Sequence, residues 1–272
     1  MSTKTAASAS PRVSIITPLH NGADYIAETL ASVQAQTWPD YEHLVIDDGS
    51  TDDGMDIVTA AAKDDPRIVP CRNDSGASGP GPTRNVGLRK AAGRYAAFLD
   101  ADDTFAPDKL ERQVGAMIET GAAFSWTAYL RMDAEGVPLG FQRVAASMSA
   151  RDWLHKKGVI GCSTTVMDRD VLGDLVMSDM PLKEDFCYFY AVLQTCDANG
   201  WLALGIDEPL AMYRVHSGGV SADKARAARA QWTALRTGLG LGRVAAARAM
   251  TSYTTNAFAQ RGREALARKL KH

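Results

Sequence analysis

The chain has 272 residues, of which 46% are hydrophobic, and a formal net charge of −2 at pH 7. This length allows one large α/β domain with an appendage or two small domains, and the apolar content excludes disorder for the bulk of the chain. No apolar run approaches the roughly 20 residues that a helix needs to span a bilayer.

The N-terminus and the cysteines both bear on the cellular compartment of the protein. Residues 1–11 are rich in Ser, Thr and Ala and lack an apolar segment, so they are predicted to be a disordered lead-in rather than a secretory signal. The cysteines form no C-x-x-C pair: Cys71, Cys162, Cys187 and Cys196. This spacing favours buried, reduced thiols in a cytoplasmic protein over a zinc knuckle or a disulfide scaffold.

Strand and helix patterns alternate through the first hundred residues. The predicted strands are Val13–Thr17, Leu44–Ile46, Ile68–Pro70 and Tyr95–Leu99. Between them, Ile26, Leu30 and Val33 recur at helical spacing, and a further helix is predicted from Thr83 to about Ala92. Alternating strands and helices predict an α/β fold with an open, mostly parallel sheet flanked by helices.

The second half is less regular. Helices are predicted from Pro107 to Gly121 and over Asp185–Asn199, and strands over Ala122–Tyr129, Thr164–Met167 and Leu210–Arg214. Residues 223–272 are Ala- and Arg-rich, with 11 basic and two acidic side chains, and are predicted to form a short helical C-terminal extension. We therefore place one domain at residues 12–222, divided into halves 12–103 and 104–222.

Polar residues gather where the predicted strands end. The first strand ends near His20 and Asn21, the second at Asp47 and Asp48, and the fourth at Asp100–Asp103. Ligands of open α/β sheets bind outside the carboxyl ends of the strands, so one crevice would receive all three groups. Carboxylates crowded after a buried strand repel one another unless a cation compensates them, and oxygen ligands suit Mg²⁺ or Mn²⁺.

Four motifs in order resemble the family 2 glycosyltransferases of the GT-A fold. They are VSIITPLHN from Val13, VIDDGSTD from Val45, TRNVG from Thr83 and FLDADD from Phe98. The resemblance covers roughly residues 12–221. It implies a GT-A-like fold, an inverting reaction and a nucleotide-diphospho-sugar donor. One departure is His20, where the family usually carries Tyr or Phe before the Asn.

The resemblance also implies roles by position. The nucleotide-sugar contacts would be Thr17, Pro18, Asn21, Asp48, Arg84 and Asp100. Asp100 and Asp102 are similar to the family's DxD pair, with Asp100 near the ribose and Asp102 ligating Mn²⁺ or Mg²⁺. His216 would complete the metal site with these two acids or touch the diphosphate, and the alternative is a structural histidine. Ser217 and Ser221 would belong to a loop that closes over the donor.

An acceptor hydroxyl needs a base as it attacks the anomeric carbon, which contributes on the order of 10² to 10⁴ in rate. Glu184 and Asp185 follow Pro181 and open a predicted helix, where acids also favour the helix dipole. This pair resembles the family's acidic pair, and we assign the base to Asp185, with Glu184 as the alternative. Trp126 and Trp153 either shape the sugar pocket or belong to the core.

The predicted function is transfer of a hexose from a UDP-sugar to a hydroxyl of a glycan or lipid-linked glycan acceptor, in bacterial polysaccharide biosynthesis. No nucleic acid is expected among the partners. The basic extension either rests on an anionic membrane at its cytoplasmic face, as a peripheral contact, or covers the core.

Three other functions are weighed. Asp100, Asp102 and Thr104 satisfy the D-x-D-x-T signature of haloacid dehalogenase-type phosphatases, but three strand–helix units precede them here. A non-catalytic nucleotide-sugar-binding protein would bind without turnover. A dinucleotide dehydrogenase is disfavoured because Pro80 and Pro82 interrupt the glycine-rich stretch.

Overall fold

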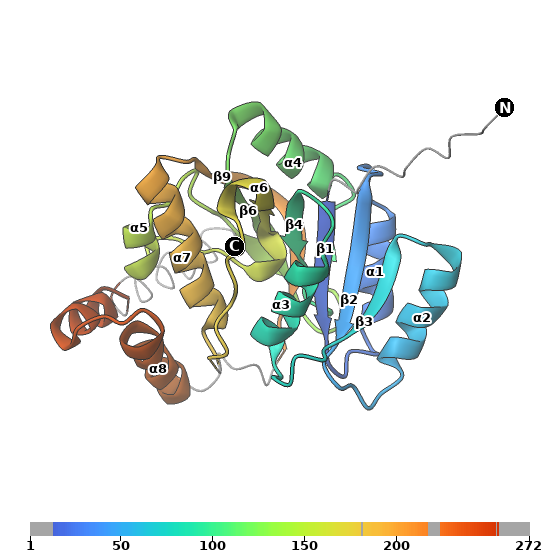
Figure 1. The fold of residues 1–272 in the computed structure, drawn as a ribbon, viewed down its shortest axis with the longest axis horizontal. Coiled ribbons are helices and arrows are strands. Elements are labelled where there is room, and N and C mark those ends of the chain that lie inside the picture. Colours follow the sequence, from blue (N-terminus) through green and yellow to red (C-terminus); the bar gives the residue numbers. More distant parts are fainter. Residues whose placement is uncertain (1–12, 181, 217–223, 254, 256–272) are drawn as a thin grey trace, which may run out of the picture.

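The computed structural model describes residues 13–180, 182–216, 224–253 and 255. Within them, nine strands form one sheet in the order β3-β2-β1-β4-β8-β6-β9-β5, with β7 paired to β6 (Figure 1). Helices cover both faces, so the predicted α/β class is confirmed. The predicted lead-in at residues 1–11 and the predicted loop serines Ser217 and Ser221 lie outside the described residues.

The first half of the chain builds the parallel part of the sheet. Its elements are β1 (Val13–Leu19), α1 (Ile26–Gln34), β2 (Tyr41–Asp47), α2 (Gly54–Asp64), β3 (Ile68–Arg72), α3 (Pro80–Lys90) and β4 (Tyr95–Phe98). The chain runs outward from β1 to β3, and α3 then returns it to β4 on the other side of β1. This reversal of direction between β1 and β4 creates the switch point at which ligands of such sheets bind.

The second half completes the sheet with mostly antiparallel strands. Its elements are β5 (Thr104–Phe105), α4 (Lys109–Thr120), β6 (Phe124–Met132), β7 (Pro138–Gln142), α5 (Ala150–Leu154), η1 (Cys162–Thr164), β8 (Thr165–Asp168), α6 (Arg169–Leu172), α7 (Glu184–Asn199) and β9 (Ala203–Arg214). β8 is antiparallel to β4 and β6, β7 to β6, and β5 to β9, whereas β6 and β9 run parallel. Every strand pair within the first half is therefore parallel, the second half adds one parallel pair, and the sheet as a whole is mixed.

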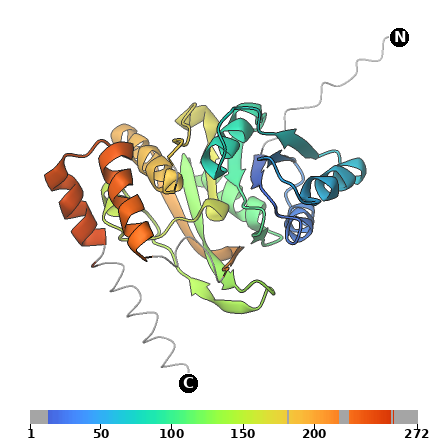
Figure 2. The same ribbon diagram turned by 90° about the horizontal axis from the view of Figure 1, so that it is seen from below.

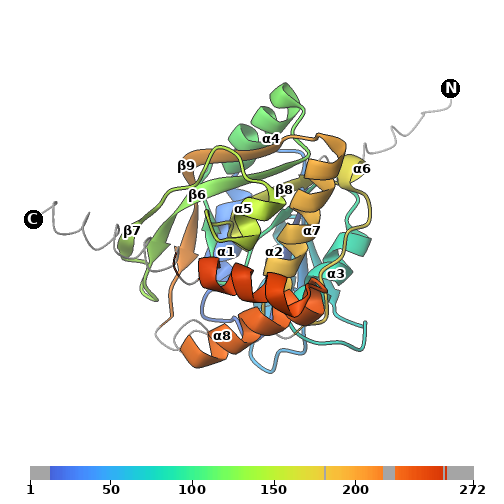
Figure 3. The ribbon, with the colours of Figure 1, turned by 90° about the vertical axis from the view of Figure 1, so that its left-hand side faces the viewer.

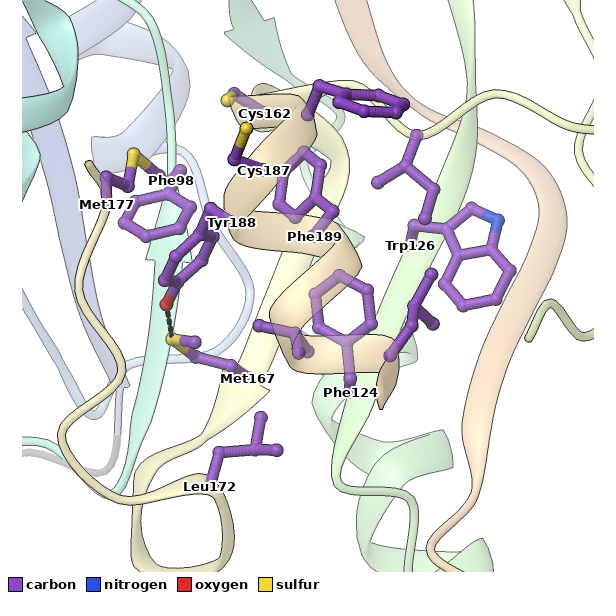
Figure 4. Packing of buried hydrophobic residues seen from close by; sticks show 14 of the residues in the cluster. Phe98, Phe124, Trp126, Cys162, Met167, Leu172, Met177, Cys187, Tyr188 and Phe189 are labelled. Carbon is purple, nitrogen blue, oxygen red and sulfur yellow. Dashed lines mark hydrogen bonds between the residues drawn. The ribbon is translucent and has the colours of Figure 1, made fainter. Parts of the chain in front are cut away.

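The core lies on both faces of the sheet because strand side chains alternate. Ile15 packs with residues of α1 and α4 on one face, and Ile16 packs with α3 and α7 on the other. Aromatic side chains dominate around α7, including Phe124, Tyr188 and Phe189 (Figure 4). Trp126 is fully buried among them, so it belongs to the core rather than to a sugar pocket.

The C-terminal extension packs against α7. It comprises α8 (Lys224–Thr233), the π-helical turn η2 (Ala234–Gly238) and helical residues 243–253. Ala234, Leu235 and Ala246 are fully buried in the cluster that contains the α7 side chains, and these helices lie beside α5 and α7 (Figure 3). Figure 2 places the extension and the α1–α2 region at opposite ends of the molecule. The extension therefore covers part of the core.

Among the described residues, no helix combines the length and the apolar character that crossing a bilayer would require.

Candidate functional site

The loops that follow β1 and β2 are tied together at the carboxyl edge of the sheet. Asn21 accepts a hydrogen bond at Oδ1 from the backbone N–H of Thr51 at 2.8 Å, and its own backbone is left-handed, with φ of 51°. Asp52 accepts from the backbone N–H of Ala23 at 2.8 Å. The exposed Asn21 thus shapes the loop over the switch point, and its predicted nucleotide contact stays a prediction.

Asp48 lies half-buried at the end of β2, beside the N-terminus of α3. Its carboxylate accepts hydrogen bonds from Asn73 Nδ2 at 2.7 Å and from the backbone N–H of Gly79 at 2.6 Å. Both bonds fix the direction of the carboxylate, and each oxygen keeps a lone pair for a further donor. Sequence reasoning missed Asn73, although it directly follows β3 at the same sheet edge and the strand-end rule applies to it.

The side chain of Thr17 is not placed as the predicted nucleotide contact requires. Its side chain is fully buried within β1, and its Oγ1 lies 2.9 Å from Nε2 of the buried His43 on β2. Burial lowers the pKa of His43 to about 3, so the imidazole is neutral at physiological pH. The Thr17 side chain therefore does not line a nucleoside pocket, whereas the next residue, Pro18, is partly exposed and remains a candidate.

Arg84 links Asp100, on the donor side of the site, to Glu184, the residue before the predicted base. Its guanidinium is only 4% exposed, forms an ion pair with Asp100 at the end of β4, and lies 3.9 Å from Glu184 Oε1 at the start of α7. Burial opposes the charged form, but Asp100 and Glu184 outweigh it and raise the pKa of Arg84. Residues 84, 100 and 184, far apart in sequence, thus form one charge network.

The segment before α7 is also anchored to α3. The side-chain amide of the buried Asn85 makes two hydrogen bonds to the backbone of Met177, one donated from Nδ2 and one accepted at Oδ1, both at 2.8 Å. Sequence analysis did not single out Asn85. Arg84 and Asn85, consecutive residues of one helix, therefore both position the approach to Glu184 and Asp185.

Asp102 and His216 lie in contact, and their predicted role as metal ligands stays a prediction. Oδ2 of Asp102 lies 2.7 Å from Nε2 of His216, and both side chains are about one-third exposed, 34% and 36%. Burial and then the nearby charge of Asp100 raise the pKa of Asp102. The neighbouring Asp103 is fully buried and accepts from the backbone N–H of Arg214 at 2.8 Å, so its role is structural.

The predicted three-ligand metal site is not formed. Among the described residues, no group of three or more His, Cys, Asp or Glu side chains is arranged to hold a metal ion. Asp100 instead accepts a hydrogen bond at Oδ1 from Arg84, with which it forms an ion pair. One carboxylate and one imidazole remain, and this donor pair fits Mn²⁺ or Mg²⁺ if phosphate oxygens and waters complete the coordination.

Asp185 lies in the first turn of α7 and is half-buried. Its Oδ1 accepts the backbone N–H of Phe186 at 2.7 Å, which fixes the carboxylate at the helix start. Glu184 is only 12% exposed, and burial and then the charge of Asp185 raise its pKa. Trp153, the second tryptophan considered for the sugar pocket, is buried beneath this turn and donates to the carbonyl of Phe186 at 2.9 Å.

The buried thiol of Cys162 lies within electrostatic reach of Arg84 and of the acids at both ends of the site. Burial is the main cause that raises the pKa of Cys162, while Arg84 lowers it and both Asp100 and Asp185 raise it further. Carboxylates from β4 and α7 thus act on the same atom. Sequence analysis interpreted Cys162 as a buried small side chain, which is confirmed.

Comparisons with known proteins agree with this arrangement. Residues 14–176 match the model of the family described as glycosyl transferase family 2. TuaG of Bacillus subtilis, a glycosyltransferase assigned to teichuronic acid biosynthesis, is 39% identical over 229 residues, covering 83% of this chain and 88% of TuaG. WfgD of Escherichia coli, named a UDP-Glc:α-D-GlcNAc-diphosphoundecaprenol β-1,3-glucosyltransferase, is 31% identical over 223 residues, 82% of this chain and 85% of WfgD.

A solved structure shares the fold. TarS of Staphylococcus aureus, residues 1–349 in complex with UDP-GlcNAc, superposes with a TM-score of 0.67 at 18% sequence identity. The match covers 91% of this chain and 73% of the TarS chain. The GT-A-like arrangement of a sheet between helices is thereby confirmed.

Proposed function

This chain belongs to glycosyl transferase family 2, and on that premise we propose that it transfers a hexose from a UDP-sugar to a hydroxyl of a glycan or lipid-linked glycan acceptor. The proposal includes inversion at the anomeric carbon and a role in bacterial polysaccharide biosynthesis. The observation that carries it is the Arg84 network, which holds the acid after β4 and the acidic pair of α7 at one site.

The names of the relatives support the substrate classes. WfgD and WfaP are both named for transfer from UDP-Glc to GlcNAc-diphosphoundecaprenol, and TarS was solved with UDP-GlcNAc. TuaG is named for the biosynthesis of a polymer, teichuronic acid. A UDP-hexose donor and a lipid-linked acceptor are therefore the substrates that we propose for this chain.

In the proposed mechanism, Asp185 accepts the proton of the acceptor hydroxyl as its oxygen attacks the anomeric carbon. The bond between that carbon and the β-phosphate oxygen breaks, and UDP leaves on the opposite face, which inverts the configuration. Asp48 would accept from the uracil ring N–H, and Asp102 and His216 would hold a divalent cation. A cation bound there would neutralise the charge that develops on the departing diphosphate.

Two alternative functions remain to be compared with this proposal: the phosphatase is tested by the family assignment, and the non-catalytic binding protein is tested by turnover. The haloacid dehalogenase interpretation is wrong, because the chain belongs to a glycosyltransferase family and the carboxylate of Asp100, its would-be nucleophile, is paired with Arg84. A non-catalytic binding protein would show nucleotide affinity without turnover. The presence of both an acid–imidazole pair and a candidate base argues against a non-catalytic protein.

The test is release of the nucleoside diphosphate from a panel of UDP- and GDP-sugars, with and without lipid-linked glycan acceptors. We expect UDP release from at least one UDP-hexose, accelerated by acceptor and by Mn²⁺ or Mg²⁺. Turnover of GDP-sugars alone would contradict the donor assignment. Binding of UDP-sugars without turnover under any of these conditions would support the non-catalytic alternative.

We further propose that the C-terminal extension makes a peripheral contact with the cytoplasmic face of the membrane. Residues 224–253 contain six basic and no acidic side chains. The exposed side chains include Arg243, Arg248 and the apolar Trp232 and Val244. A basic surface interrupted by apolar side chains suits anionic lipid, and each arginine near such a surface contributes about 1 kcal/mol.

Replacing Arg243 and Arg248 with Gln is therefore expected to weaken binding to phosphatidylglycerol-rich vesicles about 30-fold, since about 2 kcal/mol is lost. Co-sedimentation measures the effect, and neutral phosphatidylcholine vesicles should bind neither protein. The control variant replaces the exposed Arg72 and Arg89, which lie on the β3 and α3 side of the molecule. Equal losses in both variants would reject a contact through the extension.

A further inference from the structure

Two lysines from separate segments converge on one tyrosine hydroxyl beside the start of α7. Lys156 follows α5, Lys183 immediately precedes α7, and Tyr253 belongs to the helical residues 243–253. Nζ of Lys156 lies 3.2 Å from the Tyr253 hydroxyl and 4.6 Å from the ring centroid. Burial raises the pKa of Tyr253, but the charges of Lys183 and Lys156 outweigh it and lower the pKa. Both ammonium groups thus face one oxygen.

Neither lysine is neutralised by a carboxylate. Within the described part of the chain, no ion pair within 4.0 Å involves Lys156 or Lys183, although both are half-buried. The adjacent Lys157 differs, because it forms a salt bridge with Asp152 at 2.8 Å. Two partly desolvated cations without a counter-ion repel each other, and an anion between them would relieve that repulsion.

The backbone at this cluster is held in an unusual conformation. Four non-glycine residues of the described chain have a positive φ. Three of them lie here: Lys156 at 50°, Leu182 at 66° and Lys183 at 68°. Such conformations cost of order 1–3 kcal/mol each and persist only where the surrounding structure enforces them. Three of them around one pair of cations favour a formed site over two surface lysines that meet by chance.

We propose that Lys156 and Lys183 bind a phosphate group of the acceptor, so that the acceptor is a sugar carried on a diphosphate-linked lipid. The proposal rests on the proposed function and specifies its acceptor. Lys183 directly precedes Glu184 and Asp185. When the hydroxyl of an acceptor sugar contacts the base, the phosphate on the reducing end of that sugar would therefore lie toward the lysines. The Tyr253 hydroxyl, which lies between them, would donate to the same phosphate.

The site is separate from the one assigned to the donor diphosphate. Asp102 and His216 lie at the ends of β4 and β9, whereas the lysines and Tyr253 come from α5, the lead into α7 and the C-terminal extension. The elements that carry the lysine site lie side by side in Figure 3. The extension thus contributes a side chain to acceptor binding, in addition to covering the core.

The experiment compares two acceptors that share one sugar. One is GlcNAc joined through an α-diphosphate to a short alkyl chain, and the other is the uncharged alkyl glycoside of GlcNAc. In Lys156→Met/Lys183→Met, we expect the kcat/KM preference for the diphosphate acceptor to fall at least about 30-fold, through KM rather than kcat, because two charge-assisted hydrogen bonds are lost. The KM for the UDP-sugar should not change.

Two further variants keep the test decisive. Lys157→Met removes the same charge from the neighbouring residue and should leave the preference within about twofold of the wild type. Lys156→Arg/Lys183→Arg retains both charges and should restore most of the preference. Restoration by arginine would show that the lost preference comes from the lost charge and not from misfolding. An unchanged thermal midpoint of the Met double variant would show the same.

Three results would overturn the site. They are an unchanged preference in the Met double variant, an equal rise in KM for the uncharged glycoside, and a rise in KM for the UDP-sugar, which would assign the lysines to the donor. A preference for an acceptor that carries a uronate carboxylate over the diphosphate acceptor would identify a different anion and also reject the proposal. Absence of transfer by the wild type to any acceptor would instead reject the proposed function itself.

Discussion

Asp185→Asn is expected to lower kcat by at least about 10²-fold while the affinity for UDP stays unchanged. The amide cannot accept the proton of the acceptor hydroxyl, so the attacking oxygen would lose its base. The variant keeps the fold, because the Asn carbonyl oxygen can accept the backbone N–H of Phe186 as Oδ1 of Asp185 does at 2.7 Å. Initial-rate kinetics and calorimetry with UDP measure the two quantities separately.

Glu184→Gln is the matched comparison for this prediction. Glu184 is only 12% exposed and its Oε1 lies 3.9 Å from Arg84, so its carboxylate is interpreted as part of the charge network rather than as the base. We expect a smaller loss of kcat in Glu184→Gln than in Asp185→Asn. The reverse order would transfer the role of base to Glu184, and a loss below about 10²-fold in Asp185→Asn would rule out our assignment.

Asp102→Ala is expected to weaken the affinity for UDP in the presence of Mn²⁺ at least about tenfold. Even residues that only orient a metal ligand typically contribute 10- to 100-fold to metal affinity, and Asp102 is proposed to contact the cation directly. The affinity in the presence of EDTA should change little, because the loss arises from the cation and not from the nucleoside pocket. Calorimetry with UDP under both conditions measures the difference.

Asp53→Ala provides the control for Asp102→Ala. Asp53 is exposed before α2 at the same edge of the sheet and makes no side-chain capping hydrogen bond, so its removal changes the net charge equally. We expect no change in Mn²⁺-dependent affinity. An unchanged affinity in Asp102→Ala, or an equal loss in Asp53→Ala, would show that Asp102 does not hold the cation.

The elements that follow from local pattern were predicted well from the sequence. The helix predicted over Asp185–Asn199 is α7, which ends at Gly200 in the left-handed conformation, as the residue type suggests. The strands of the first half were found from short apolar runs. β5 was not predicted because it contains only two residues. β7 was not predicted because all its residues but the last are exposed and show no alternation of apolar and polar side chains.

The partners of the site residues depend on contacts between distant segments, which the local pattern does not contain. The sequence placed Arg84 near the donor, but its contact with Glu184 joins positions a hundred residues apart. The hydrogen bond that Asp100 accepts from the same guanidinium was not predicted either. Thr17 was misplaced for a different reason: the motif identifies the residue, whereas its orientation is set by His43 on the neighbouring strand.

The contribution of the extension was the least predictable part. Its basic composition indicated an anionic partner, but the position of Tyr253 beside Lys156 arises from packing of residues 243–253 against the rest of the domain. Composition alone could not distinguish a helix that covers the core from one that completes a binding site. The structure supports the first role, and the second is the acceptor site that we propose.

The central claim is that one cleft holds the donor at Asp102 and His216 and presents Asp185 to the acceptor. A crystal structure of the protein with UDP and Mn²⁺ tests it most directly. We predict the ion between Asp102, His216 and the diphosphate, with the uracil beside Asp48 and the carboxylate of Asp185 facing the open side of the β-phosphate. UDP bound away from Asp102, or Asp185 on a face that shares no cleft with it, would contradict the claim.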